Sequence, residues 1–239
     1  MAFPELCLTA YTCSDLFLQE SLLREAKKEL KRILQASKSK DMILFVGMPW
    51  MHKGKLYNVA AVLNRGRILG IVPKKHLPNY SEFYELRHFN PGMEKVEMTD
   101  WEGVQVPMGM NLLFACRTMP ELVLAAELCE DVWVPCPPSI SHALAGATVI
   151  ANCSASDETT GKDQYRYNLI CGQSARLVCG YIYANAGEGE SSQDLVFGGQ
   201  NIIAENGTCL VQSDRFKNAC ICADLDLGRI ISERRRMTT

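Results

Sequence analysis

Leu122-Val-Leu-Ala-Ala-Glu-Leu-Cys129-Glu130-Asp131 is typical of a short apolar strand that ends on a cysteine and two acids. The prolines in the following Trp133-Val-Pro-Cys-Pro-Pro138 cannot continue a sheet, so they force a turn directly after the strand. A cysteine at a strand end points out of the sheet, where a substrate can reach a nucleophile. The alternative, which this local pattern alone favours, is a buried and unreactive cysteine.

Two other segments place charged residues beside apolar ones. Lys74 follows Pro73 and precedes a Pro/Tyr/Glu-rich loop that ends at Glu85, which suits a positioned cation and a loop that lines a substrate. The alternative, favoured for this segment in isolation, is a solvated lysine pair on a surface turn. Glu5 lies between apolar residues in Phe3-Pro-Glu-Leu6, and an unpaired buried carboxylate is costly. It is therefore either exposed at a strand end or functional.

The bulk composition indicates a globular α/β protein. The 239 residues are enough for one large domain or two small ones, and 47% of them are hydrophobic. The net charge is −2 and the basic residues are dispersed, so nothing indicates a nucleic-acid partner. We predict that the one dense basic run, Arg234–Arg236, is solvated surface or the start of a linker. No apolar run approaches the ~18 residues of a membrane-spanning helix.

The eleven cysteines do not form a disulfide framework. They are scattered and odd in number, and no secretory signal peptide precedes them, which favours a reduced, cytoplasmic protein. The sequence contains no CxxC pair, and its four histidines lack the spacing of zinc ligands, so we predict no metal site.

Apolar periodicity predicts one domain of mixed strands with helices packed outside them. A helical pattern runs from Asp15 to Ala36, with Ser14 or Asp15 as N-cap. A buried strand follows at 42–48, and Asn64-Arg-Gly66 joins two strands in a hairpin. The remaining predicted elements are strands at 104–107, 112–116, 122–128, 148–153 and 180–186, helices at 139–145 and 162–179, and further hairpins towards the C-terminus.

Taken together in this order, three motifs resemble the nitrilase (carbon–nitrogen hydrolase) superfamily and its Glu–Lys–Cys triad: FPEL, VPKKHLPNYSEFYE and AAELCEDVWVPCPPS. Further stretches resemble the glutaminase domain of glutamine-dependent NAD synthetases, namely FPELCLTAYTCSDLF, GATVIANCSASDE, YIYANAGEGESSQDLVFGG and the closing SERRRMTT. The resemblance runs from Met1 to Thr239 and includes many non-catalytic positions. It is far more specific than any of the motifs alone.

The resemblance implies a role for each matching residue. Glu5 corresponds to the general base, Lys74 to the catalytic lysine and Cys129 to the nucleophile. The positions that hold the glutamine substrate are Tyr80, Ser156 and Lys162, with Glu85 and Glu130 as supporting acids of second rank. Lys162 stands where some relatives have arginine, and a lysine cannot clamp a carboxylate with two parallel hydrogen bonds.

These residue types suit amide hydrolysis through a thioester. The cysteine attacks the amide carbon, Glu5 takes the thiol proton, and Lys74 with the backbone N–H after Cys129 stabilises the negative oxygen. A Cys–His mechanism is the competing interpretation for an intracellular cysteine enzyme, but none of the four histidines lies in a setting that marks it as a base.

The family fold is a four-layered αββα sandwich, and its members carry a strand, a helix and another strand before FPEL. We therefore expect residues 1–239 to form a glutaminase domain that is N-terminally incomplete. Such a loss would expose core surface and leave Glu5 on a frayed terminus, which predicts a poorly active or unstable chain. We likewise expect these residues to lack the family's synthetase domain, which follows ERRR, and ATP and Mg are implied only for that domain.

The implied function is hydrolysis of the glutamine side-chain amide, which supplies ammonia for ATP-dependent NAD synthesis from deamido-NAD. The implied partners are glutamine, a synthetase domain and further copies of the chain in a homo-oligomer, and the glutaminase reaction itself needs no cofactor. Two alternatives remain: a stand-alone amidase acting on another small amide, and an inactive fragment that serves as an assembly domain.

Overall fold

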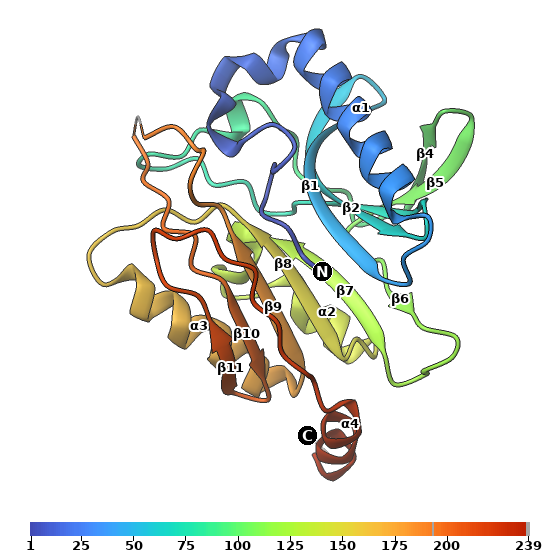
Figure 1. Cartoon of the computed structure of the whole chain (residues 1–239), viewed down its shortest axis with the longest axis vertical. Helices are drawn as coiled ribbons and strands as arrows, with labels where there is room; N and C mark the ends of the chain where they lie inside the picture. Colours follow the sequence, from blue (N-terminus) through green and yellow to red (C-terminus); the bar gives the residue numbers. More distant parts are fainter. Residues whose placement is uncertain (193, 238–239) are drawn as a thin grey trace.

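The computed structural model of the chain describes residues 1–192 and 194–237, which form two face-to-face sheets with helices on both outer faces (Figure 1). This is the four-layered αββα arrangement that the sequence predicts. Helix α1 (Glu20–Ser37) covers the first sheet. Helices α2 (Pro138–Leu144) and α3 (Lys162–Leu177) cover the second, and α4 (Leu227–Arg236) projects beyond it.

The first sheet is built on two consecutive hairpins. Its strand order is β1-β2-β3-β5-β4, in which only β3 and β5 run parallel. The turns at Lys53-Gly54 and Arg65-Gly66 have positive φ at both residues, as the tight turns of twisted hairpins require. The strands are β1 (Ile43–His52), β2 (Lys55–Asn64), β3 (Arg67–Pro73), β4 (Glu97–Trp101) and β5 (Val104–Met108).

The second sheet has the order β11-β10-β9-β8-β7-β6, with β7, β8 and β9 parallel. The carboxyl ends of these three strands therefore share one edge, the usual place for a site in an α/β sheet. The strands are β6 (Phe114–Ala115), β7 (Val123–Leu128), β8 (Val149–Ser154), β9 (Gly180–Asn185), β10 (Ile202–Glu205) and β11 (Thr208–Gln212).

Three apolar layers hold the sandwich together. One lies between α1 and the first sheet and another between the second sheet and its helices. The central layer joins the inner faces of the two sheets and includes Phe45, Val62, Leu128 and Cys153, all buried. Each large apolar side chain buried there stabilises the fold by about 1.5–3 kcal/mol.

The N-terminal segment runs between the two sheets and is firmly held, so the expected frayed terminus is wrong. Ala2 forms a parallel bridge with Phe45, and the N–H of Glu5 donates to the carbonyl of Ser154 at 3.2 Å. The segment passes so close to β1 that a Cβ at Gly47 would lie 2.4 Å from backbone atoms of Pro4 and Leu6. Both sheets therefore fix Glu5.

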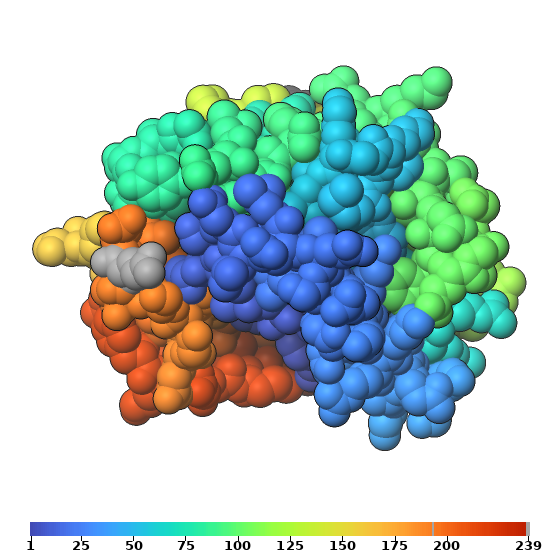
Figure 2. Space-filling view, turned by 90° about the horizontal axis from the view of Figure 1, so that it is seen from above, coloured from blue at the N-terminus to red at the C-terminus, as the bar shows by residue number. Residues whose placement is uncertain are grey.

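The predicted start of the first helix is also wrong. Residues Tyr11–Leu18 form a kinked 3-10 segment, η1, and the N-cap of α1 is Gln19. Asp15 instead pairs with Arg87 and His88. Viewed from above, η1 lies between the loop after β3 and the loop after β9 (Figure 2). Glu190 of the latter loop accepts hydrogen bonds from the N–H groups of Tyr11 and Thr12.

The basic run near the C-terminus is only partly solvated. Arg235 and Arg236 are exposed, but the guanidinium of Arg234 donates to the carbonyls of Ala147, Leu177 and Val178. It thereby binds α4 to the end of α3. The prediction of a purely solvated run is therefore wrong for Arg234.

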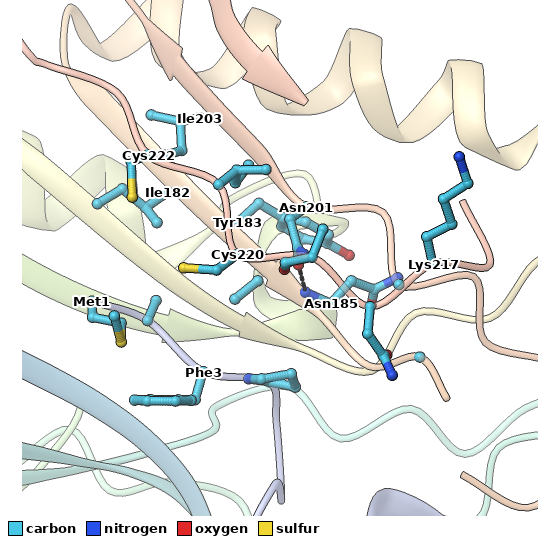
Figure 3. Close-up of a pocket in the computed structure, with 18 of the residues that line it drawn as sticks. Met1, Phe3, Ile182, Tyr183, Asn185, Asn201, Ile203, Lys217, Cys220 and Cys222 are labelled. Carbon is cyan, nitrogen blue, oxygen red and sulfur yellow. Dashed lines mark hydrogen bonds between the residues drawn. The ribbon is translucent and has the colours of Figure 1, made fainter. Parts of the chain in front are cut away.

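A groove of about 740 Å³ opens between the N-terminal residues, β9 and the segment 217–223. Met1 and Phe3 face Ile182, Cys220 and Cys222 across it (Figure 3). None of the predicted site residues lines this groove. Within 1–192 and 194–237, no helix is long and apolar enough to cross a membrane, and no acid, histidine and cysteine side chains cluster as metal ligands would.

Candidate active site

Cys129 directly follows β7 and begins a short 3-10 turn, η3 (Cys129–Val132). Its φ is +40°, a left-handed conformation that costs a non-glycine residue about 1–3 kcal/mol and persists only where the surroundings impose it. The N–H of Cys129 donates to Oδ1 of Asn152, on the adjacent strand β8, at 3.0 Å. The strand end therefore presents the thiol in a fixed, strained turn.

Asp131 joins this turn to the segment that carries the predicted catalytic lysine. Its carboxylate accepts hydrogen bonds from the N–H groups of Leu128 at 3.1 Å and His76 at 2.8 Å. Burial raises the pKa of Asp131 to about 6, although these backbone donors oppose the shift. The buried carboxylate of Asp131 therefore holds the turn at Cys129 next to the segment that follows Lys74.

Lys74 lies fully buried between two carboxylates. Its Nζ is 2.7 Å from Oε1 of Glu5 and 2.5 Å from Oε1 of Glu85. Burial alone lowers the pKa of Lys74, but the two carboxylates outweigh burial and raise that pKa well above its ordinary value. Lys74 is therefore a charged group at the centre of the site, and the surface-turn alternative is wrong.

Glu5 combines strong anchoring with one accessible lone pair. Its Oε1 accepts from Lys74 and from Nδ2 of Asn58, the latter at 2.6 Å, and its Oε2 accepts from the N–H of Ala155 at 3.1 Å. Among the described residues Oε2 has no second donor, and a carboxylate oxygen can accept two hydrogen bonds. Glu5 is thus held in place with an oxygen that can take a proton.

Glu85 pairs with Lys74, the predicted catalytic lysine. It accepts a hydrogen bond from the hydroxyl of Tyr11 at 2.9 Å, in addition to the one from Lys74. Burial raises the pKa of Glu85 to about 7, against the opposing effect of Lys74. Burial therefore favours the protonated form of Glu85, next to the cation of the site.

The thiol of Cys129 is protonated at neutral pH. Burial and the negative charge of Glu5 raise its pKa, and Lys74 only partly opposes them. Attack by this thiol requires a base that removes its proton, because the thiolate is the nucleophilic form. Glu5 is a carboxylate whose charge acts on Cys129.

Cys129 lies at a cavity of about 380 Å³. Four of the five residues predicted to hold substrate line it: Tyr80, Glu130, Ser156 and Lys162. The fifth, Glu85, does not. No histidine in the described part of the chain lines this cavity, so the Cys–His interpretation has no geometric support.

The cavity wall has an acidic side and a basic side. The hydroxyl of Tyr80 donates to both carboxylate oxygens of Glu130, at 3.0 and 3.2 Å. Lys162 pairs with Asp157, and its Nζ lies 5.8 Å from the ring centre of Phe83 and 5.5 Å from that of Trp133. Glu130 and Lys162 thus place charges of opposite sign on the wall of the cavity.

Sequence reasoning missed several polar residues of the site, above all Asn58, Asp157 and Asn152. Asn58 and Asn152 each interrupt an apolar strand, and such an interruption was the available signal. A polar side chain in a buried strand needs a hydrogen-bond partner, but the sequence does not name that partner.

The family model for carbon–nitrogen hydrolases matches residues 1–235. Over 99% of its length the chain is 45% identical to a glutamine-dependent NAD(+) synthetase of Mycobacterium tuberculosis, and 32% identical to one of Aquifex aeolicus. It spans only 35% and 38% of the length of these curated relatives.

Solved structures show the same fold. A glutamine-dependent NAD(+) synthetase from Cytophaga hutchinsonii superposes with a TM-score of 0.78 at 29% identity, over 90% of this chain and 34% of that one. A carbon–nitrogen hydrolase from Helicobacter pylori, 20% identical, shares the fold with a TM-score of 0.72 over 98% of this chain and 79% of its own. The chain belongs to the carbon–nitrogen hydrolase family.

Proposed function

We propose that this chain hydrolyses the side-chain amide of glutamine through a thioester on Cys129. The observation that carries the proposal is the cavity at Cys129, which has an anion, Glu130, on one wall and a cation, Lys162, on another. Glutamine presents an ammonium and a carboxylate group at one end and an amide at the other. The charged end fits the walls of the cavity while the amide reaches the thiol.

In the first half of the reaction, Glu5 takes the proton of Cys129 as the sulfur attacks the amide carbon. The amide oxygen gains a full negative charge, which Lys74 and the N–H of Glu130 stabilise, each by about 3–4 kcal/mol in analogous sites. When the carbon–nitrogen bond breaks, the proton passes from Glu5 to the nitrogen and ammonia leaves. The glutamyl group remains on sulfur as a thioester.

In the second half, Glu5 removes a proton from a water molecule that attacks the thioester carbonyl. The new tetrahedral oxygen occupies the same stabilised position. Collapse releases glutamate and returns the proton to sulfur. Glutamine and water are thus the only reactants, and we propose that this step needs no cofactor.

The ammonia serves, in this proposal, the ATP-dependent amidation of deamido-NAD by a synthetase domain. The support is the identity to glutamine-dependent NAD(+) synthetases, of which this chain matches about a third. A cytoplasmic location fits the eleven cysteines, all of which are free. We also propose a homo-oligomer, on the resemblance alone.

The test is ammonia release from glutamine by the purified chain. Because both sheets hold Glu5 in place, we expect turnover of about 1–10³ per second rather than the poor activity that a frayed terminus predicts, and none for Cys129→Ala. Lys162→Met should raise KM more than kcat falls, because the cation binds substrate and transition state alike. The matched variant Lys217→Met removes an exposed lysine that pairs with Asp214 and should change neither.

A panel of small amides and nitriles decides between the alternatives. Turnover of another amide, with none of glutamine, would identify a stand-alone amidase. No turnover of any substrate by a folded chain would favour the assembly domain and contradict the proposal.

A further inference from the structure

Glu127 is a buried carboxylate close to the nucleophile for which the reaction proposed above has no use. It lies on β7 two residues before Cys129, is 1% exposed and does not line the cavity. Among the described residues, no cation lies within ion-pair distance of it. A buried acid without a cation is costly, so its hydrogen bonds decide what it does there.

Those hydrogen bonds connect Glu127 to the backbone of Cys129 across three neighbouring strands. The hydroxyl of Tyr181, on β9, donates to Oε1 of Glu127. The same oxygen of Tyr181 accepts from Nδ2 of Asn152, on β8, at 3.2 Å. Asn152 in turn accepts the N–H of Cys129 through Oδ1 at 3.0 Å.

The donor and the acceptor of each hydrogen bond in this series are determined. The N–H of Cys129 can only donate, so the oxygen of the Asn152 amide faces it and the NH₂ faces Tyr181. The hydroxyl of Tyr181 therefore has to donate onward, to Glu127. The other oxygen of Glu127 accepts the N–H of Ser139 at 2.8 Å, so both oxygens of ionised Glu127 act as acceptors.

We propose that Glu127, Tyr181 and Asn152 are positioning residues, whose hydrogen-bonded chain fixes the N–H of Cys129 and thereby directs its thiol towards Glu5. The strained φ of Cys129 needs such a constraint. The N–H of Cys129 itself is occupied by Asn152. The N–H of Glu130 and the side chain of Lys74 therefore remain to stabilise the amide oxygen. The proposal concerns the nucleophile and does not depend on glutamine as substrate.

Glu127→Gln tests the direction of these hydrogen bonds with almost no change in the shape of the side chain. The N–H of Ser139 donates to the amide oxygen of the glutamine at position 127. The NH₂ group of that glutamine therefore faces the hydroxyl of Tyr181, which already accepts a hydrogen bond from Asn152. Tyr181→Phe removes the same link from the other side. Both variants should loosen the turn at Cys129, although neither Glu127 nor Tyr181 itself lines the cavity.

The experiment measures the rate constant of alkylation of Cys129 by iodoacetamide in the native chain, by peptide mass spectrometry. Alkylation needs the thiolate, so the rate reports how well the thiol is aligned with Glu5. We expect each variant to lower the rate constant about tenfold to 100-fold. Both variants break the same series of hydrogen bonds. The alkylation rate constant of the double variant should therefore be no lower than that of the slower single variant.

Two cysteines serve as controls within the same digest. Exposed Cys222 should react at one rate in every variant, and buried Cys153 should stay unmodified wherever the chain is folded. Tyr57→Phe removes the hydroxyl of a buried tyrosine in the other sheet and should not affect Cys129. An unchanged or faster Cys129 rate in folded Tyr181→Phe, or single effects that multiply in the double variant, would overturn the proposal.

Discussion

At the scale of single residues, the site depends on one buried cation shared by two acids. Lys74 touches both Glu5 and Glu85, and all three side chains are almost completely excluded from solvent. The pair of carboxylates exceeds the cation in charge when both are ionised. The raised pKa of Glu85, about 7, relieves that excess, because a proton is held there below neutrality.

Removal of that cation should destabilise the fold as well as stop the reaction. In Lys74→Met the two buried carboxylates lose their partner, and breaking a buried pair in this way costs about 3–5 kcal/mol. Urea unfolding measures the loss. Lys75→Met, at the neighbouring, half-exposed lysine, should cost at most about 1 kcal/mol. Equal unfolding midpoints for the two variants would contradict this account of the site.

The residues found from the sequence are those that lie in motifs. Glu5, Lys74 and Cys129 were predicted because three motifs occur together, and the structure brings Glu5 and Lys74 into contact near Cys129. Asn58 and Glu127 were not predicted. Their partners lie on other segments, and a strand pattern contains no information about which polar group faces which across a sheet.

At the scale of elements, apolar runs predicted the buried strands. Two elements with mostly polar sequences, β4 and α4, were not predicted. β4 was missed because only Thr99 of its five residues is buried. α4 was missed because only Ile230 of its ten residues is fully buried and four of the ten are arginines. Both elements bury little apolar surface: β4 packs Trp101 against Trp50, and α4 buries Ile230.

Arg234 is the side chain that holds α4. Its loss removes three hydrogen bonds from a charged donor to carbonyls, and we expect Arg234→Ala to destabilise the chain by about 1.5–3 kcal/mol. The exposed neighbour provides the control, because Arg235→Ala should lie within about 0.5 kcal/mol of the unmodified chain. Thermal unfolding of both variants checks this, and equal melting temperatures would show that α4 is held in another way.

At the scale of the whole molecule, buried acids make stability depend on pH. Burial raises the pKa of Glu127 to about 7, against about 4.3 for an exposed glutamate. Between these values the folded chain holds a proton that the unfolded chain has released. The free energy of unfolding therefore falls as pH rises through this window.

Glutamine at position 127 does not titrate, so Glu127→Gln should gain stability relative to the unmodified chain between pH 5 and pH 8. The gain is on the order of 3 kcal/mol, at 1.36 kcal/mol per pKa unit. Urea unfolding at the two pH values measures it, with the exposed Glu121→Gln as a control that should show no gain. A difference that does not vary with pH would mean that Glu127 titrates normally. A variant that is more stable yet slower to alkylate separates positioning from stability.

The anchoring of Glu5 has a consequence for the order in which the site comes into being during synthesis. Oε2 of Glu5 is held by the N–H of Ala155, 150 residues further along the chain. A ribosome adds about 5–20 residues per second, so Ala155 is made roughly 8–30 s after Glu5. Cys129 is made before Ala155 as well, so Glu5 still lacks this one hydrogen bond when the cysteine is made. Glu5 is therefore fully anchored only after β8 has been made, and the proposed reaction should not precede that step.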